Sequence, residues 1–233
     1  QVIARRLRRR GIWSPAETAL SKQLLRPGMI VLDIGANIGY FTLVFARQVG
    51  PTGRVYAFEP EPDNFGLLQR NVARNGYANV TAVQAAVGQH AARQRLYKSA
   101  DNLGDHRLGH GAAGRDWVEV PVVALDDFFA GSELRIDFIK MDIQGAELTA
   151  LRGMRRLVAT RAPLALITEF WPGGIQALGD NPETYLQELC VLGFALSVVR
   201  PGERVRLVPL EGRDALRELC ARGEEVNLFC RRT

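Results

Sequence analysis

The sequence predicts an α/β fold with a mostly parallel sheet, and three observations lead to that prediction. Short runs rich in β-branched residues alternate with helix-length amphipathic segments, first within residues 29–87 and again after residue 135. One interruption, residues 91–129, has the period-two alternation of antiparallel strands. The chain has 233 residues, enough to bury a sizeable core. We therefore expect a seven-stranded sheet with helices on both faces and an antiparallel excursion.

The first half of the chain is predicted to run β-α-β-α-β after a leading helix. That helix starts at "SPAE", which fits a capping box with Ser14 as N-cap and Glu17 reaching back, and it stops at Pro27-Gly28. Glycine and proline turns end most of the elements that follow. These are strands 29–34, 54–59 and 80–87, and helices 40–49 and 64–75.

After the excursion, the second half of the chain again alternates strands with helices, as expected for a parallel sheet. Within residues 91–129, a polar, glycine-rich loop at 100–116 separates two segments in which apolar and polar residues alternate. We expect the tip of this loop to contribute residues to a site. The predicted elements then are strand 136–143, helix 146–160, strand 164–171, helix 182–193, strands 195–200 and 204–209, helix 212–222 and strand 226–232. We expect seven core strands, with the last two forming a hairpin.

Charge is concentrated at the start of the chain. The net charge of +5 equals the five arginines within residues 1–10, so the remaining chain carries 25 basic and 25 acidic residues. We therefore divide the chain into a basic segment, 1–12, and a domain, 13–233. The domain lacks the basic footprint of a nucleic-acid-binding protein, so no nucleic acid is expected as a partner. No apolar run reaches the length of a membrane span.

The three cysteines are Cys190, Cys220 and Cys230, and none belongs to a CxxC or Cys/His pattern. An odd number without metal-ligand spacing argues against a disulfide framework and against a zinc site. Each lies among apolar residues, which predicts small buried hydrophobes in a reducing compartment such as the cytoplasm.

A glycine turn follows the first predicted strand in "VLDIGANIGY". Dinucleotide-binding proteins have GxGxxG at this position so that backbone N–H groups can approach a pyrophosphate. Here Gly35 and Gly39 flank Asn37, and Asp33 precedes the turn. A carboxylate about 4 Å from a phosphate charge would be repelled by about 4 kcal/mol at an effective dielectric of about 20. The ligand is therefore expected to be cationic at that end.

Glu59 ends the second predicted strand, 24 residues after Gly35, where an acid can accept both hydroxyls of a ribose. S-adenosylmethionine (SAM) satisfies both expectations, because it carries an ammonium, a sulfonium and a ribose but no phosphate. Asp33 and Glu59 together are a more specific signal than the glycines alone.

Several segments, taken in order, resemble the FkbM family of SAM-dependent methyltransferases. They are "VLDIGANIGYFT", "VYAFEPEPDNFGLLQRNV", "NLGDHRL", "VVALDDF" and "IDFIKMDIQGAELTALRGM", and the likeness runs from about Trp13 to Pro172. The resemblance implies a Rossmann-like class I methyltransferase fold and transfer of a methyl group to a hydroxyl of a sugar, polyketide or related small metabolite.

The resemblance also implies site residues. Asp33, Gly35, Asn37 and Gly39 match the first SAM motif, Glu59 matches the ribose-binding acid, and Ala86 lies in the segment that packs the adenine. One position departs from the family pattern, which often reads D-x-E-G-A-E where this chain has Gln144. The loss of that charge puts a metal-site or base role at this position in doubt.

Methyl transfer to an alcohol needs a base, or a cation that acidifies the hydroxyl. Asp142 and Glu169 end neighbouring predicted strands at the carboxyl edge of the sheet, where open α/β sheets bind ligands. Glu147 follows five residues after Asp142, as a third carboxylate or as a helix-start charge that complements the dipole. The three could hold a base and its orienting partners or a magnesium-like ion. His106 is the other catalytic candidate, and His110 a weaker one in the same loop.

We therefore predict a SAM-dependent O-methyltransferase (EC 2.1.1.-) that acts on a small polar metabolite. The predicted catalytic residues are Asp142, Glu169 and His106, and a divalent metal remains an alternative to a side-chain base. Two rival functions stay open. One is an NAD-type Rossmann oxidoreductase, and the other is a non-catalytic SAM-fold module that binds a partner through its arginine-rich start.

Overall fold

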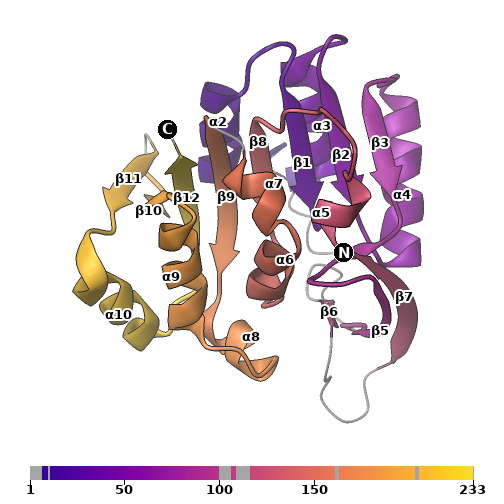
Figure 1. Cartoon of the computed structure of the whole chain (residues 1–233). Helices are drawn as coiled ribbons and strands as arrows, with labels where there is room; N and C mark the ends of the chain where they lie inside the picture. The colour runs from indigo at the N-terminus through magenta and orange to yellow at the C-terminus, as the bar shows by residue number, and fades with distance from the viewer. Residues whose placement is uncertain are drawn as a thin grey trace.

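A computed structural model describes residues 7–9, 11–99, 106–108, 116–160, 163–202 and 205–232. The described elements form three layers, with one large sheet between two layers of helices (Figure 1). The sheet has eight strands in the order β11-β10-β12-β9-β8-β1-β2-β3. The strands are β1 (Ile30–Ile34), β2 (Arg54–Phe58), β3 (Val80–Val83), β8 (Phe138–Met141), β9 (Leu164–Phe170), β10 (Ala195–Arg200), β11 (Arg206–Pro209) and β12 (Val226–Arg232).

Five neighbouring strands of this sheet pair in parallel, and the other three join it through antiparallel pairs. β3, β2, β1, β8 and β9 run in one direction. β12 then pairs antiparallel with β9 and with β10, and β11 pairs antiparallel with β10 at the edge. β1 lies in the middle of the parallel part, so the turns after β1, β2, β8 and β9 meet at one edge of the sheet.

Helices cover both faces of the sheet because successive residues of each strand point to opposite sides. Val31 and Val55 pack with α2 (Pro15–Leu24) and α3 (Tyr40–Val49), while Ala57 packs with α4 (Pro62–Arg74). Leu32 and Ile34 face the other way. That side holds α5 (Leu125–Phe128), α6 (Glu147–Gly153), α7 (Arg155–Ala159), α8 (Pro172–Ala177), α9 (Pro182–Val191) and α10 (Gly212–Arg222).

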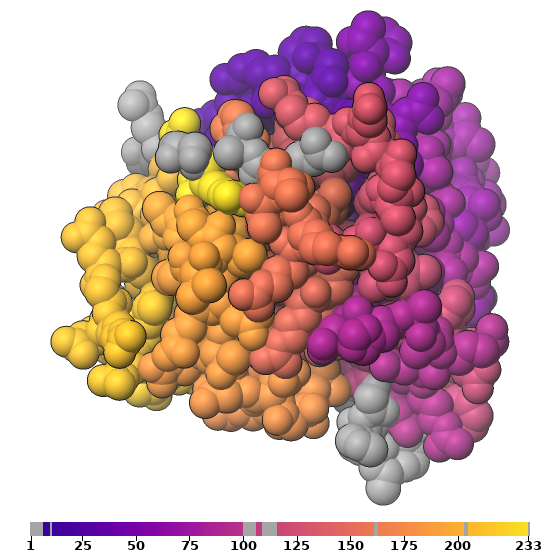
Figure 2. Space-filling model, in the orientation of Figure 1, coloured from indigo at the N-terminus to yellow at the C-terminus, as the bar shows by residue number. Residues whose placement is uncertain are grey.

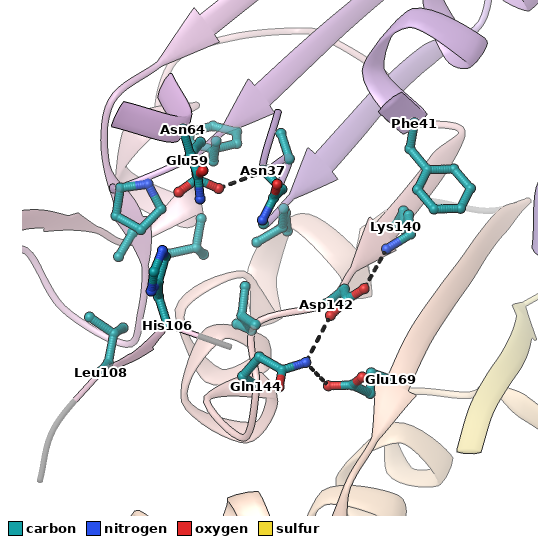
Figure 3. A pocket seen from close by; sticks show the side chains of 18 of the residues that line it. Asn37, Phe41, Glu59, Asn64, His106, Leu108, Lys140, Asp142, Gln144 and Glu169 are labelled. Atoms are coloured by element: carbon teal, nitrogen blue, oxygen red, sulfur yellow. Dashed lines mark hydrogen bonds and ion pairs between the residues drawn. The ribbon is translucent and has the colours of Figure 1, made fainter. Parts of the chain in front are cut away.

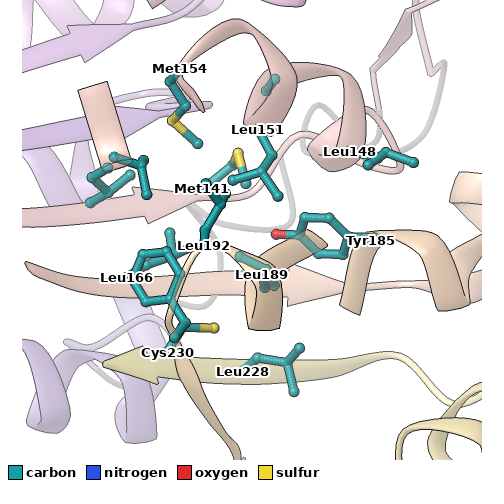
Figure 4. Packing of buried hydrophobic residues seen from close by; sticks show 14 of the residues in the cluster. Met141, Leu148, Leu151, Met154, Leu166, Tyr185, Leu189, Leu192, Leu228 and Cys230 are labelled. Atoms are coloured by element: carbon teal, nitrogen blue, oxygen red, sulfur yellow. The ribbon is translucent and has the colours of Figure 1, made fainter. Parts of the chain in front are cut away.

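The larger core cluster lies between the sheet and this second helix layer. Met141, Leu166 and Leu228 of the sheet meet Leu151 of α6 and Leu189 of α9 (Figure 4). In the space-filling view, the second half of the chain covers the middle and left of the face seen, and the first half lies at the top and right (Figure 2). Burial of the apolar stripe on each helix is the main force that holds these layers together.

The excursion forms three strands of a second, four-stranded sheet, and its antiparallel pairs agree with the period-two pattern. Its order is β4-β7-β5-β6, with β4 (Ala86–Val87), β5 (Ala92–Tyr97), β6 (Arg107–Leu108) and β7 (Trp117–Val123). β5 pairs antiparallel with β6 and β7. Figure 1 shows this small sheet beyond the carboxyl ends of β1 and β2, so it stands over the edge where a ligand would bind.

The α/β prediction is confirmed, with differences in detail. The described main sheet has eight strands instead of seven, with β11 at its edge and β12 between β9 and β10. The predicted strand 80–87 is two strands in different sheets, and the predicted helix 146–160 breaks at Met154 into α6 and α7. The hairpin joins β10 and β11, and the closing strand β12 is not part of it.

The predicted capping box at the start of α2 is wrong. Ser14 is the N-cap, but its side chain makes no cap hydrogen bond and its φ is +38°. The Ser14 hydroxyl donates instead to the Glu17 carboxylate, which is 5% exposed. Glu17 is therefore a buried charge and not a backbone cap.

The cysteines are free thiols, and only Cys230 is buried as predicted. Cys190 is exposed on α9 and Cys220 is partly exposed on α10, because each lies near the edge of its helix's apolar stripe. Among the described residues, no helix combines the length and apolar character required to cross a bilayer.

Candidate active site

A cavity of about 430 Å³ opens at the carboxyl ends of β1, β2, β8 and β9 (Figure 3). The small sheet lines its other side through Ala86, Leu96 and Leu108. A cavity of this size is typical of small-molecule sites. The predicted site residues that line it are Gly35, Asn37, Glu59, Ala86, His106, Asp142 and Glu169.

The glycine turn after β1 is held in a conformation that requires glycine at its first position. Gly35 has a φ of +82°, and a Cβ there would lie 2.0 Å from the carbonyl oxygen of Asp142. Asn37 also has a positive φ, +50°, and its side chain accepts the N–H of Ile38. Asparagine tolerates this left-handed conformation better than most residues, which explains why it can replace a glycine here.

Glu59 follows β2 and is fixed by the glycine turn. Its Oε2 accepts the backbone N–H of Asn37 at 2.7 Å, and its Oε1 accepts that of Glu61 at 2.9 Å. Burial raises the pKa of Glu59 to about 7, although these hydrogen bonds favour the ionised form. The Asn64 side chain also hydrogen-bonds to this carboxylate, and the lone-pair capacity that remains is available to hydroxyl groups of a ligand in the cavity.

Asp33 lies behind the turn and not on the cavity wall. Its side chain is 1% exposed, and its Oδ2 accepts the Thr42 hydroxyl at 2.5 Å. Burial raises its pKa to about 6, while the nearby ammonium of Lys140 opposes this shift. Asp33 therefore lies close to the cavity as predicted, but it is buried behind the cavity wall and can act on a ligand only through its electric field. Gly39 likewise starts α3 without lining the cavity.

An apolar slot borders the Glu59 side of the cavity. Ala85, Ala86 and Val87 line it together with Phe58 and Leu96. β4 puts its backbone there because it has left the main sheet to pair with β7. Apolar walls beside a carboxylate suit a ligand that has both an aromatic ring and hydroxyl groups.

A chain of polar side chains runs along the ends of β8 and β9 (Figure 3). The Lys140 ammonium contacts Asp142 Oδ2 at 3.0 Å. The Gln144 amide nitrogen donates to Asp142 Oδ1 at 3.3 Å and to Glu169 Oε2 at 2.7 Å. Asp142 and Glu169 are therefore brought together, as their strand-end positions predicted.

Lys140 is a buried, charged member of this row of polar side chains, and the sequence did not lead us to predict it. It is 3% exposed, and its ammonium lies 4.6 Å from the centre of the Phe41 ring. Burial disfavours its charge, but the carboxylates of Asp142, Glu17 and Asp33 outweigh burial and raise the pKa of Lys140. The available signal was a lysine inside an apolar strand, which needs a buried partner.

Glu169 is a poorly solvated carboxyl beside another acid. It is 7% exposed, and burial raises its pKa well above the usual range, with further increases from Asp142 and Glu147. A carboxyl whose pKa lies closer to neutrality is a better proton acceptor than an ordinary one.

Glu147 does not join Asp142 and Glu169 in the cavity lining. Its Oε1 accepts the N–H of Ile143 and its Oε2 accepts that of Gly145, so it holds the loop before α6. Burial raises its pKa to about 7. Glu147 is near the other two carboxylates but does not share the cavity with them, as expected for a charge at a helix start. The described ranges contain no group of three or more His, Cys, Asp or Glu side chains that could hold a metal ion.

His106 comes from the excursion and lines the cavity just before β6. Its Nδ1 accepts the backbone N–H of Ser99 at 3.1 Å. A backbone N–H can only donate, so the neutral ring carries its proton on Nε2. His106 is therefore arranged to donate a hydrogen bond and not to take a proton. His110 lies outside the described residues.

Two further cavity residues were not predicted. Trp171 follows β9, and the guanidinium of Arg107 stacks 4.3 Å from the centre of its ring. Gly174 fits against the ring, since a Cβ there would lie 2.2 Å from Trp171. This contact joins the excursion to the start of α8, and both residues line the cavity. Trp13 also lines the cavity, ahead of α2.

Comparisons with known proteins find methyltransferases. The model of the methyltransferase FkbM domain matches residues 33–195. "Methyltransferase 1" of Beauveria bassiana is 31% identical over 146 residues, 53% of this chain and 57% of that protein. "31-O-demethyl-FK506 methyltransferase FkbM" of Streptomyces tacrolimicus is 30% identical over 159 residues, 56% of this chain and 61% of that protein. The chain thus spans about three-fifths of the length of these relatives.

A solved structure shares the fold. The crystal structure of methyltransferase FkbM from Methylobacillus flagellatus superimposes with a TM-score of 0.57 at 20% identity. The match covers 94% of this chain and 48% of that one.

Proposed function

The chain belongs to the FkbM methyltransferase family, and we propose that it is a SAM-dependent O-methyltransferase. Its acceptor would be a hydroxyl of a small polar metabolite, such as a sugar, glycoside or polyketide. The observation that carries the proposal is the Glu59 carboxylate, which two backbone N–H groups hold at the cavity wall beside an apolar slot.

The half of the cavity near β1 and β2 suits SAM. Glu59 would accept the two ribose hydroxyls, and the backbone of Gly35 and Asn37 would approach the ligand closely. The adenine would lie on Ala86. Asp33 would attract the cationic end through its field, and a phosphate in the same place would meet the combined charge of Asp33 and Glu59.

The half near β8 and β9 suits the acceptor. SAM supplies a methyl group bonded to a sulfonium, which is a good leaving group. With SAM bound, the acceptor oxygen would bond to the methyl carbon as the carbon–sulfur bond breaks, and the sulfur would keep that electron pair. The hydroxyl proton passes to Glu169, whose Oε1 is not used by Gln144.

Asp142 and His106 would have supporting roles. Asp142 is paired with Lys140 on one oxygen and with Gln144 on the other, so both of its oxygens already have partners and its role would be to orient the base. His106 would contact the acceptor from the excursion side of the cavity. The catalytic set keeps the three predicted residues, with the proton assigned to Glu169.

The test is transfer of a radiolabelled methyl group from SAM to extracts that contain sugars, lipids and peptides. The proposal predicts label in a small hydroxyl compound, and loss of a general base predicts a rate about 100- to 10,000-fold lower in Glu169→Gln. Glu183→Gln, at a partly buried position on α9 that does not line the cavity, is the matched control and should keep the wild-type rate. Full activity of Glu169→Gln would remove Glu169 as the base, and label in no fraction would contradict the proposed reaction.

A further inference from the structure

The amide of Gln144 occupies the space between the two carboxylates of the acceptor half. Its Nε2 is the shared donor to Asp142 Oδ1, at 3.3 Å, and to Glu169 Oε2, at 2.7 Å. A side-chain amide has two N–H groups, and here each has a carboxylate to donate to. Because ionised carboxylates only accept hydrogen bonds, the nitrogen end of the amide has to face them.

The backbone of this loop is held in an uncommon conformation. Gln144 has a φ of +56°, and it is one of three non-glycine residues with a positive φ among those described. Gly145 follows with a φ of +105°, and a Cβ there would lie 2.5 Å from the carbonyl carbon of Gly174. Glu147 accepts two N–H groups of the same loop. Such strain persists only where surrounding contacts enforce it, and here it carries the Gln144 side chain toward the carboxylates.

We propose, on the basis of the proposed function, that Gln144 is a positioning residue whose amide takes the place of a divalent cation between Asp142 and Glu169. The two N–H groups keep the carboxylates together and oriented, and they leave no room between them for an ion. The base of this chain then works without a cation, and a glutamate at position 144 would open a cation site.

The chemistry of hard cations supports this assignment. Magnesium and calcium bind carboxylate oxygens at about 2.0–2.6 Å, and they need several such ligands. Asp142 and Glu169 supply two carboxylates, but the atom between them is a hydrogen-bond donor. Lys140 already neutralises the other oxygen of Asp142. Gln144→Glu is nearly isosteric and would turn the donor into a third oxygen ligand.

The experiment is a Mn²⁺ titration followed by electron paramagnetic resonance on the wild-type chain and on Gln144→Glu. The expected result is one Mn²⁺ per chain in Gln144→Glu, bound at least tenfold more tightly than by the wild type and displaced by excess Mg²⁺. Gln187 is the matched control, because its amide also donates to a carboxylate, that of Glu183, but at an exposed position. Gln187→Glu should bind Mn²⁺ as weakly as the wild type. Equal Mn²⁺ affinity in the wild type and Gln144→Glu would overturn the proposal.

A second variant tests positioning without a metal and guards against misfolding of the first. Gln144→Met removes both N–H groups at similar volume. Because those groups favour ionised carboxylates, the pH midpoint of the Glu169 titration, followed by carboxyl NMR, should rise in Gln144→Met. An unchanged midpoint in a folded Gln144→Met chain would contradict the positioning role.

SAM calorimetry on the same samples separates this inference from the proposed function. Each folded variant should bind SAM within a few-fold of the wild type, since Gln144 lies on the acceptor side. Normal SAM binding with unaltered Mn²⁺ and pH behaviour would reject the role of Gln144 alone. Failure of the wild type to bind SAM would instead reject the proposed function.

Discussion

Gly35→Ala is the substitution that tests the geometry of the site most severely. A Cβ at this position would lie 2.0 Å from the carbonyl oxygen of Asp142 and 3.0 Å from its carbonyl carbon. Neither side can move easily. The Gly35 N–H donates to Phe58 O at 3.0 Å, and the Asp142 N–H donates to Ile34 O at 3.0 Å. The new methyl group would therefore push apart the ends of β1 and β8.

The expected loss of stability has two parts. A φ of +82° costs an alanine about 1–2 kcal/mol. Forcing an extra carbon into a filled space costs about 1–3 kcal/mol more. The total of about 2–5 kcal/mol corresponds to a fall in Tm of about 4–20 °C for a chain of this size.

Gly223→Ala is the matched control for backbone strain. Gly223 ends α10 with a φ of +63°, and a Cβ there would meet nothing within 4 Å. Its cost should be the strain of about 1–2 kcal/mol alone. The assays are thermal and urea unfolding followed by circular dichroism, with SAM calorimetry on both variants. Gly35→Ala should also bind SAM at least tenfold more weakly, and Gly223→Ala should not. If the two variants were equally stable and bound SAM equally well, the close approach of the turn to Asp142 would be refuted.

The remaining predictions concern pH, Asp142 and the basic segment. Burial raises the pKa of Glu59 from 4.5 to about 7, so between those values the folded chain binds more protons than the unfolded chain. The free energy of unfolding of the unliganded chain should therefore fall as pH rises through this window, while SAM affinity should rise as Glu59 ionises. Urea unfolding and calorimetry at several pH values would check both signs, and a parallel rise would contradict them. Asp142→Asn should abolish turnover and keep SAM affinity within a few-fold, and retained turnover would remove Asp142 from the catalytic set. Deletion of residues 1–10 should leave methyl transfer intact, and a loss of transfer would show that the basic segment belongs to the enzyme.

Most of the fold could be predicted because local patterns and packing agree. The β-branched runs and their glycine or proline boundaries predicted β1, β2, β8 and β9, whose carboxyl ends carry the site. The break between β3 and β4 was not predictable from "VTAVQAAV", because β4 leaves the sheet only to pair with β7. The break between α6 and α7 likewise depends on a distant contact. A Cβ at Gly153 would lie 1.9 Å from Gly88 O.

The site residues that could be predicted are acidic side chains at the ends of predicted strands. Asp142 and Glu169 meet because parallel strands end at the same edge. The bridge through Gln144 and the pairing of Lys140 with Asp142 depend on side-chain directions that spacing does not determine. The Glu147 side chain points toward backbone N–H groups because of the strained loop before α6. The sequence therefore left its role open between a third carboxylate of the site and a helix-start charge.

Calorimetry of the wild-type chain with SAM and, separately, with NAD tests the central claim most directly, with Glu59→Gln as the paired variant. The account predicts binding heat with SAM and none with NAD. It also predicts at least a tenfold loss of SAM affinity in Glu59→Gln, because hydrogen bonds to a charged group contribute about 1.5–3 kcal/mol. Binding of NAD, or SAM affinity that is unchanged in Glu59→Gln, would contradict it.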